Sequence, residues 1–440
     1  MQFSLWWAAP FAGLLLSIAF WPLAAPIFWH RHFGKIAAGW ALAFLGPFAL
    51  AFGPGAAAEG LAHALLAEYL PFILLLTALY TVSGGIHIRG NLHGSPALNC
   101  AILLTGAALA GFVGTTGASM LLIRPLIRAN DHRRRNAHVV IFFIFIVGNI
   151  GGALTPLGDP PLFLGFLRGV DFFWTARHVL PHMLLLLAAL LALFYVIDRH
   201  LLRREGAGLP DPTPDTHGIR VEGAANFLLL AATVALVLMS GAWKSAAQWH
   251  VLGVEIALPG LLRDAGLLAV TAASLAITPR AVRQRNQFAW APMRETAKLF
   301  AGIFLTILPV IAMLQAGAGG PLGAVTRAVT RADGSPDPAM IFWVTGLLSA
   351  FLDNAPTYLI FFNAAGGDAA QLMGPQAGVL TAISAGAVFM GALTYIGNAP
   401  NLMTKAIAED RGVNMPGFFG YMAWSAALLL PLFAALTWLM

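Results

Sequence analysis

The segment GALTPLGDPP (residues 152–161) returns as GALTYIGNAP (residues 391–400), with six of ten positions identical. The two copies lie 239 positions apart, which indicates a duplicated unit. Each copy is a polar, Gly- and Pro-rich interruption of an apolar stretch that would otherwise be long enough to cross a bilayer. The repeat therefore predicts two discontinuous transmembrane helices, one in each half of the chain.

Composition sets the class of the whole chain. Of its 440 residues, 59% are hydrophobic and only 10% are charged, whereas about a quarter are charged in a soluble domain. The apolar runs are long and unbroken, while the strands of a membrane barrel are about 10 residues long and alternate in polarity. We therefore predict an all-α polytopic membrane protein.

Hydropathy predicts about ten spanning helices, two of which are the broken helices. Two further stretches are too interrupted by glycine and polar residues to be single spans, and we interpret them as re-entrant hairpins. The uninterrupted spans are about 4–27, 38–56, 61–82, 178–198, 224–242, 264–278, 299–316 and 418–438; the broken helices are about 138–167 and 376–403; the hairpins are about 96–126 and 339–365.

Basic residues predict the orientation. If the N-terminus lies outside, 19 of the 25 Lys and Arg residues fall on the cytoplasmic side and six outside, as the positive-inside rule requires. The C-terminus then also lies outside. We expect the protein to reside in the inner (plasma) membrane. The net charge of +6 is thus explained by topology, and we expect the lipid bilayer, not nucleic acid, as the partner of these cations.

The two hairpins enter from opposite sides in this topology, so the halves form an inverted repeat. The first repeat is predicted at 1–205 and the second at 224–440, joined by a Pro- and Asp-rich cytoplasmic linker at 206–223. In such proteins the binding site lies near the bilayer midplane, where the halves meet.

Two carboxylates fall near that midplane. Asp159 lies in the first broken helix and Asp353 in the second hairpin, and neither motif contains Lys or Arg. An ionised carboxylate near the midplane costs free energy unless it is paired or hydrated. Such a carboxylate therefore favours a bound proton, which it can exchange for a cation such as Na⁺. Asn398 replaces Asp159 in the second copy of the repeat, which predicts one proton acceptor and one neutral oxygen donor.

Other oxygen-bearing side chains of the interruptions complete the candidate site. The candidate cation- or proton-binding residues besides the two Asp residues are Asn149, Thr155, Asn354, Thr394, Asn398 and Asn401. The candidate substrate-binding residues at the hairpin tips are Thr115, Thr116, Ser119 and Thr357. Sodium is expected as transported or coupling ion, with no other cofactor.

These motifs resemble those of a known group. GNIGGALTPLGDPP (residues 148–161), FLDNAPTYLIFF (residues 351–362) and GALTYIGNAPNLM (residues 391–403) are similar to signatures of the ion-transporter superfamily. That group includes NhaD-type sodium/proton antiporters, arsenite pumps and citrate carriers. The resemblance, closest to the NhaD type, implies a scaffold domain, a transport domain of hairpins and broken helices, elevator-like movement and a homodimer.

Two functions follow from the resemblance. At Asp159 and the Asp353–Asn354 pair it implies sodium/proton antiport. However, the first hairpin, VGTTGASMLL (residues 113–122), has no carboxylate and is more similar to carboxylate carriers. A sodium- or proton-coupled transporter of a small anion is therefore the alternative.

Catalytic functions are disfavoured. An intramembrane aspartyl hydrolase would need two Asp residues on facing helices, but Pro156 precedes Gly158 in place of the first glycine of a GxGD motif. The chain also contains no G-x-x-x-x-G-K-[ST] motif for binding a nucleotide. We therefore do not expect an enzyme.

Overall fold

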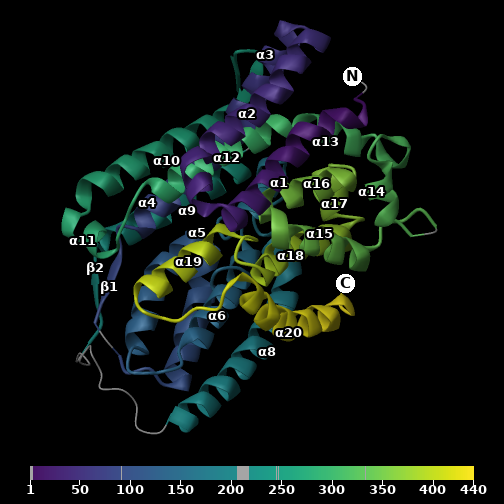
Figure 1. The fold of residues 1–440 in the computed structure, drawn as a ribbon. Helices are drawn as coiled ribbons and strands as arrows, with labels where there is room; N and C mark the ends of the chain where they lie inside the picture. Colours follow the sequence, from purple (N-terminus) through teal and green to yellow (C-terminus); the bar gives the residue numbers. More distant parts are fainter. Residues whose placement is uncertain (1–2, 91, 206–217, 244, 246, 332) are drawn as a thin grey trace.

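The computed structural model describes residues 3–90, 92–205, 218–243, 245, 247–331 and 333–440, and these are almost entirely helical (Figure 1). The helices are α1 (Ala9–Ala24), α2 (Pro26–Phe52), α3 (Pro54–His63), α4 (Leu70–Ser83), α5 (Pro96–Ala129), α6 (Ala137–Ile146), α7 (Pro160–Leu167), α8 (Trp174–Glu205), α9 (Ala225–Ala242), α10 (Leu258–Ile277), α11 (Arg280–Arg285), α12 (Ala291–Thr306), α13 (Leu308–Gln315), α14 (Gly323–Ala328), α15 (Pro338–Leu352), α16 (Asn354–Ala364), α17 (Ala369–Met373), α18 (Ala377–Phe389), α19 (Ala399–Asp410) and α20 (Phe418–Thr437). Short 3₁₀ segments at Ile150–Leu154 and Met390–Leu393 extend α6 and α18, and a π-helical turn at Ala64–Tyr69 joins α3 to α4.

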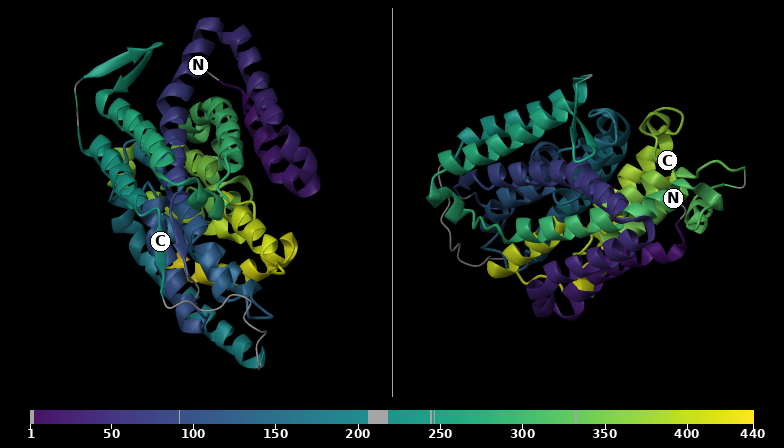
Figure 2. Two further views of the ribbon diagram at one scale, coloured as in Figure 1. Left: turned by 90° about the vertical axis from the view of Figure 1, so that its left-hand side faces the viewer. Right: turned by 90° about the horizontal axis from the view of Figure 1, so that it is seen from above.

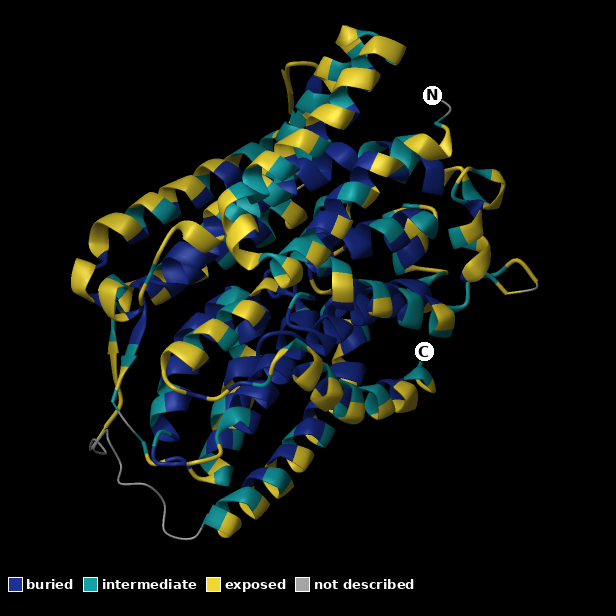
Figure 3. Ribbon diagram, in the orientation of Figure 1, coloured by how far each residue is buried: buried dark blue, intermediate teal, exposed yellow. Residues whose placement is uncertain are grey.

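The prediction of an all-α polytopic membrane protein is confirmed. Among the described residues, nine helical segments are long and apolar enough to cross a bilayer, or ten if the bent pair α12–α13 is one span. In the segment Ala137–Leu154, 89% of the residues are buried, whereas in α9 only 17% of the residues are buried. The first broken helix therefore lies at the centre, and the outer helices carry the exposed residues, as the burial colours show (Figure 3).

The boundaries of one span were predicted wrongly. The basic segment HRHFGK (residues 30–35), expected as a loop, lies inside α2. Pro26 at the first helical position favours this early start. Helix α12 packs against this part of α2, because the Trp29 indole donates to Glu295 (3.0 Å) and the Lys298 ammonium lies 5.6 Å from the centre of the Phe33 ring.

Two short antiparallel ribbons were not predicted. Strand β1 (His87–Arg89) pairs with β2 (Arg220–Glu222), and β3 (Gln248–Val251) pairs with β4 (Val254–Ala257). Residues 206–217 of the predicted linker lie outside the described residues, while its end forms β2. The first ribbon ties the start of the second half to the segment that precedes α5.

Both predicted hairpins are present as chain reversals. Helix α5 reverses at Gly114, where φ is 77°, a region that glycine enters without a steric penalty. Its ends meet, since the Gly94 amide donates to the Ala129 carbonyl (2.6 Å) and the amides of Asn99 and Asn130 bond each other at 2.9 Å. Thus α5, although counted above by length and composition, folds back on itself as a hairpin.

The second hairpin consists of α15 and α16, which pack together and reverse at Asp353. Asp353 has φ 88°, a conformation that a residue other than glycine rarely adopts. The reversals at Gly114 and Asp353 are 239 positions apart, the spacing of the sequence repeat. In Figure 1 the ends of α5 lie toward the lower left and those of α15 and α16 toward the right.

The two broken helices share their backbone geometry. Thr155 and Thr394 are extended, with φ of −138° and −133°. Asp159 and Asn398 then precede the first residues of α7 and α19, with φ of −142° and −151°. Both chain termini lie at one end of the molecule, opposite α11, as Figure 1 and the right-hand view of Figure 2 show.

Candidate functional site

Four interruptions meet around the carboxylate of Asp159, which is 1% exposed. Its Oδ1 accepts hydrogen bonds from Thr115 Oγ1 (3.1 Å) and Asn398 Nδ2 (3.2 Å), and its Oδ2 accepts one from Asn354 Nδ2 (2.6 Å). Thr115 comes from the first hairpin and Asn354 from the second, whereas Asp159 and Asn398 come from the two broken helices. We call these four residues the central cluster.

The central cluster is internally symmetric in sequence. Thr115 and Asn354 are 239 positions apart, and so are Asp159 and Asn398. Each member immediately precedes, or is the first residue of, a helical segment that begins after a break. Four helix N-termini therefore converge on one point, and the partial positive charge of these ends favours an anion there.

A second set of amides supports the central cluster. Asn149 Nδ2 donates to Asn401 Oδ1 and to the Ile144 carbonyl, both at 2.8 Å. Asn401 Nδ2 donates to the carbonyls of Gly391 and Thr394, both at 2.9 Å. These contacts join the two broken helices to each other. Asn149 Oδ1 also accepts a hydrogen bond from Asn398 Nδ2 (3.3 Å), so Asn149 is linked to Asp159 through Asn398, and Asn401 is linked through Asn149.

Thr155 and Thr394 connect each broken helix to the hairpin of its own half. Thr155 Oγ1 donates to the Gly111 carbonyl, and Thr394 Oγ1 donates to the Ala350 carbonyl. Both bonds join residues 44 positions apart. Each hydroxyl also accepts a main-chain N–H from the residues that follow it. The two threonine hydroxyls thus donate hydrogen bonds to carbonyls that have no helical partner because of the breaks.

The remaining predicted residues lie at the hairpins but outside the central cluster. The Asp353 carboxylate accepts the Ala355 N–H (3.2 Å), and Thr357 Oγ1 donates to the Asp353 carbonyl (2.9 Å). Asp353 and Thr116 are half-buried, and the Thr116 hydroxyl has no hydrogen bond to any residue that the structure describes. Ser119 Oγ is buried and has no hydrogen-bond partner within the described part of the chain.

Sequence reasoning missed two contributors to this geometry. Ser349 Oγ donates to Asn354 Oδ1 (2.7 Å), which turns the Asn354 N–H₂ group toward Asp159. A Cβ on Gly391 would lie 2.4 Å from that same Oδ1, so only glycine fits there. Gly391 and its counterpart Gly152 stand in the repeated motif, which could have indicated them, but Ser349 lies in an apolar helix without any pattern.

Charge and ligand type limit the chemistry of the site. All hydrogen-bond partners of Asp159 are neutral, and among the described residues no Lys or Arg forms an ion pair with it or with Asp353. No group of three or more His, Cys, Asp and Glu residues suited to a metal occurs within the described ranges. The arrangement suits a proton or Na⁺ that would be held by one carboxylate and neutral oxygens.

A polytopic helical protein with a buried carboxylate where four broken segments meet is typical of membrane transporters. The family follows from comparison: the family model CitMHS_2, described as "Putative citrate transport", matches residues 1–440. The chain is a member of this family of transporters. This result confirms the resemblance to the ion-transporter superfamily.

Curated relatives agree with this class. An uncharacterized transporter of Mycobacterium bovis and one of Mycobacterium tuberculosis are each 26% identical to the chain over 330 residues, covering 73% of this chain and 71% of the relative. The 46 kDa membrane protein of Mycobacterium leprae is 26% identical over 327 residues, with the same coverage.

Proposed function

We propose that the protein transports a small multivalent carboxylate of the citrate type, coupled to a proton or Na⁺ that binds at Asp159. The observation that carries this proposal is the convergence of four helix N-termini on the central cluster. Backbone N–H groups and the helix dipole at such ends favour carboxylate and phosphate ligands. The description of the family supports the same cargo.

The carbonyl groups at the breaks favour the anion over a second cation. A cation carrier needs free carbonyls as ligands, but those of Gly111, Ala350, Gly148 and Gly391 each already accept a side-chain hydrogen bond from Thr155, Thr394, Asn398 and Asn401 respectively. The Asp159 carboxylate is then the charged ligand for a coupling cation, with neutral oxygens around it.

Coupling follows from the cost of charge in the membrane. A multivalent anion and an ionised Asp159 together would be strongly disfavoured in the low-dielectric centre of the bilayer. Binding of a proton or Na⁺ at Asp159 removes one negative charge and so permits the loaded site to cross. The proposal includes an elevator-like movement of the hairpins and broken helices in a plasma-membrane homodimer, with both termini outside.

Sodium/proton antiport is the second candidate, and Asp353 favours it. Its carboxylate is half-buried and unpaired with any described cation, next to Asn354, which bonds Asp159. Two carboxylates this near to one site can exchange protons for a cation without an organic anion. The hydrolase alternative is weaker, because Asp159 bonds three neutral residues and not Asp353.

The test uses purified protein in liposomes, with labelled citrate uptake and an internal pH dye. We expect uptake to rise with an inward proton or sodium gradient, and no pH change when sodium is added without citrate. Asp159→Asn should abolish gradient-driven uptake and leave the protein monodisperse. Asp333→Asn, the same change in an exposed loop, is the matched control. A pH response to sodium alone, with no citrate uptake, would reject carboxylate transport in favour of antiport.

A further inference from the structure

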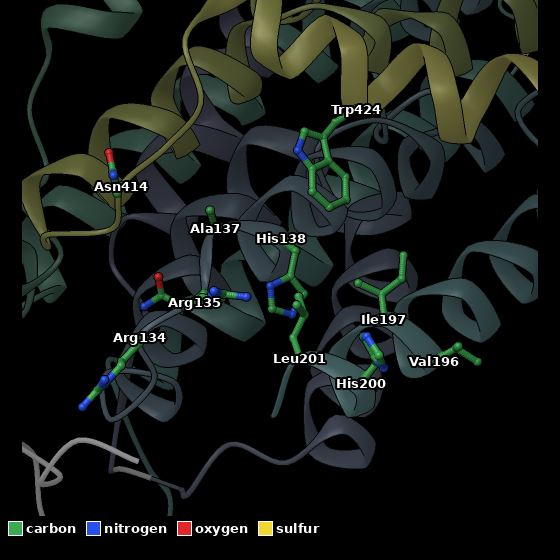
Figure 4. A pocket seen from close by; sticks show the side chains of 11 residues that line it. Arg134, Arg135, Ala137, His138, Val196, Ile197, His200, Leu201, Asn414 and Trp424 are labelled. Carbon is green, nitrogen blue, oxygen red and sulfur yellow. The ribbon is translucent and has the colours of Figure 1, made fainter. Parts of the chain in front are cut away.

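A mostly apolar pocket with basic residues at its rim lies away from the central cluster. A pocket of about 510 Å³ opens between the start of α6, the end of α8 and the segment that leads into α20 (Figure 4). Its walls include Arg134, Arg135, His200, Ile197, Leu201 and Trp424. None of these residues contacts Asp159, so the pocket needs an explanation of its own.

The pocket lies at a membrane boundary. Along α8 the apolar run ends at Ile197 and is followed by Asp198, Arg199 and His200. Val196, one turn before His200, is 65% exposed, and Trp424 is 37% exposed. An exposed apolar residue, a half-exposed indole and a sudden change to charged residues are typical of the depth at which phospholipid head groups lie.

The charge around the pocket is unevenly compensated. Arg133 and His138 are buried and both bond the Asp198 carboxylate. Glu205 accepts the main-chain N–H groups of Arg134 and Arg135. The guanidinium groups of these two arginines have no hydrogen-bond partner in the described part of the chain.

Other charged groups nearby add to the excess. Arg199, Arg203 and Arg204 lie on the same end of α8, and Asp198 and Glu205 are the acidic residues of that end. Arg133 pairs with Asp198, and Arg134, Arg135 and Arg199 outnumber Glu205, so the described residues around the pocket carry a net positive charge.

We propose that this pocket binds the head group of an anionic phospholipid. The cations Arg134 and Arg135 and the polar ring of His200 complement a phosphate, while Ile197, Leu201 and Trp424 cover the start of an acyl chain. Basic pockets between helices on the positively charged face of membrane proteins bind such head groups. A small free anion would use the rim but gain nothing from the apolar walls.

Such a lipid would connect three elements that carry or surround the central cluster. Helix α6 begins at the pocket and leads to Asn149, and α8 and α20 pack against each other beside it. The bound lipid is therefore expected to stabilise the folded protein. This inference does not depend on the identity of the transported substrate.

The experiment measures thermal unfolding and native mass spectra of the full chain in detergent, with added phosphatidylglycerol, phosphatidylcholine, inorganic phosphate or citrate. We expect phosphatidylglycerol alone to raise the unfolding temperature and to remain bound in the mass spectrum. In R134A/R135A its affinity should fall about 30-fold, since each basic residue near an anionic surface contributes about fivefold. The matched control is R280A/R294A, which removes two exposed arginines of α11 and α12 that do not line the pocket.

Two results would reject the proposal. One is an equal response to phosphatidylglycerol in R134A/R135A and wild type; the other is equal stabilisation by inorganic phosphate or citrate, which would assign the pocket to a free anion. If R134A/R135A folds poorly, His200→Gln gives a second variant at the rim. Its weaker binding of phosphatidylglycerol, with an unchanged unfolding temperature in lipid-free detergent, would support the lipid site.

Discussion

The carboxylate of Asp159 and the amide of Asn398 occupy equivalent positions in the two halves, yet only Asp159 can ionise. Both side chains reach the same cluster, because Asn398 Nδ2 lies 3.2 Å from Asp159 Oδ1. A carboxylate at both positions would place two like charges in direct contact inside the membrane, which is strongly unfavourable. The Asp/Asn difference therefore keeps one ionisable group in a symmetric environment.

This symmetry predicts that the carboxylate can be moved from position 159 to the equivalent position 398 with transport retained. The double variant Asp159→Asn/Asn398→Asp places the carboxylate on α19, still within reach of the other members of the central cluster. We expect it to recover labelled citrate uptake to within about tenfold of wild type, because the two positions are energetically coupled. Asp159→Asn alone is the reference. A double variant that folds but is as inactive as the single variant would show that the position, and not only the charge, is required.

At the scale of elements, the reversals depend on backbone conformation. Gly114 has φ 77°, and a Cβ there would lie 3.3 Å from the Leu157 carbonyl oxygen. We expect Gly114→Ala to lower the free energy of unfolding by about 1–2 kcal/mol. Gly39→Ala, in the middle of α2 with open space around it, should instead be neutral or stabilising by up to about 1 kcal/mol. Unfolding in detergent measures both, and equal effects would contradict strain at Gly114.

The bonds from Thr155 and Thr394 predict matched effects in the two halves. Replacing either threonine by valine keeps the shape but leaves a buried carbonyl, of Gly111 or of Ala350, without its side-chain partner. Each variant should lose about 1–3 kcal/mol of stability. Thr116→Val serves as control and should change stability little, because that hydroxyl bonds no described residue. Stable Thr155→Val and Thr394→Val proteins would mean that other groups replace these bonds.

At the scale of the whole molecule, function as proposed requires the hairpins to move relative to their surroundings. The first hairpin touches α4 closely: a Cβ on Gly117 would lie 3.2 Å from Ser83 Cβ, near the range of about 3.5–4.5 Å found in disulfides. Helix α4 belongs to the expected scaffold, so this contact joins a proposed fixed part to a proposed moving part.

We predict that a disulfide between these positions arrests transport. In a Cys100→Ala background, Ser83→Cys/Gly117→Cys should lose citrate uptake when oxidised and regain it on reduction, while each single cysteine variant should transport under both conditions. Mass spectrometry of the oxidised protein verifies the bond. Full uptake by completely cross-linked protein would exclude movement between α4 and the first hairpin.

Local pattern was sufficient for the class of fold and for part of the site. Apolar length predicted the spans, and the repeat at 152–161 and 391–400 predicted the broken helices and singled out Asp159 and Asn398. These features are local because a backbone N–H or C=O group without a hydrogen bond is costly in lipid. A membrane-spanning segment is therefore either a continuous helix or a helix with an interruption that is visible in its sequence. The start of α2 and the strands β1 and β2 escaped this reasoning, since they depend on partners distant in the chain.

Which polar residues meet was set by packing between segments far apart in the sequence. Asn354 reaches Asp159 across 195 positions, and Ser349 and Gly391 orient it, while Asp353 turns to its own backbone. The pocket beside α6 and α8 also arises only where three elements come together. Hydropathy and motifs describe each segment alone, whereas the direction of a side chain and its partner result from how all segments pack at once.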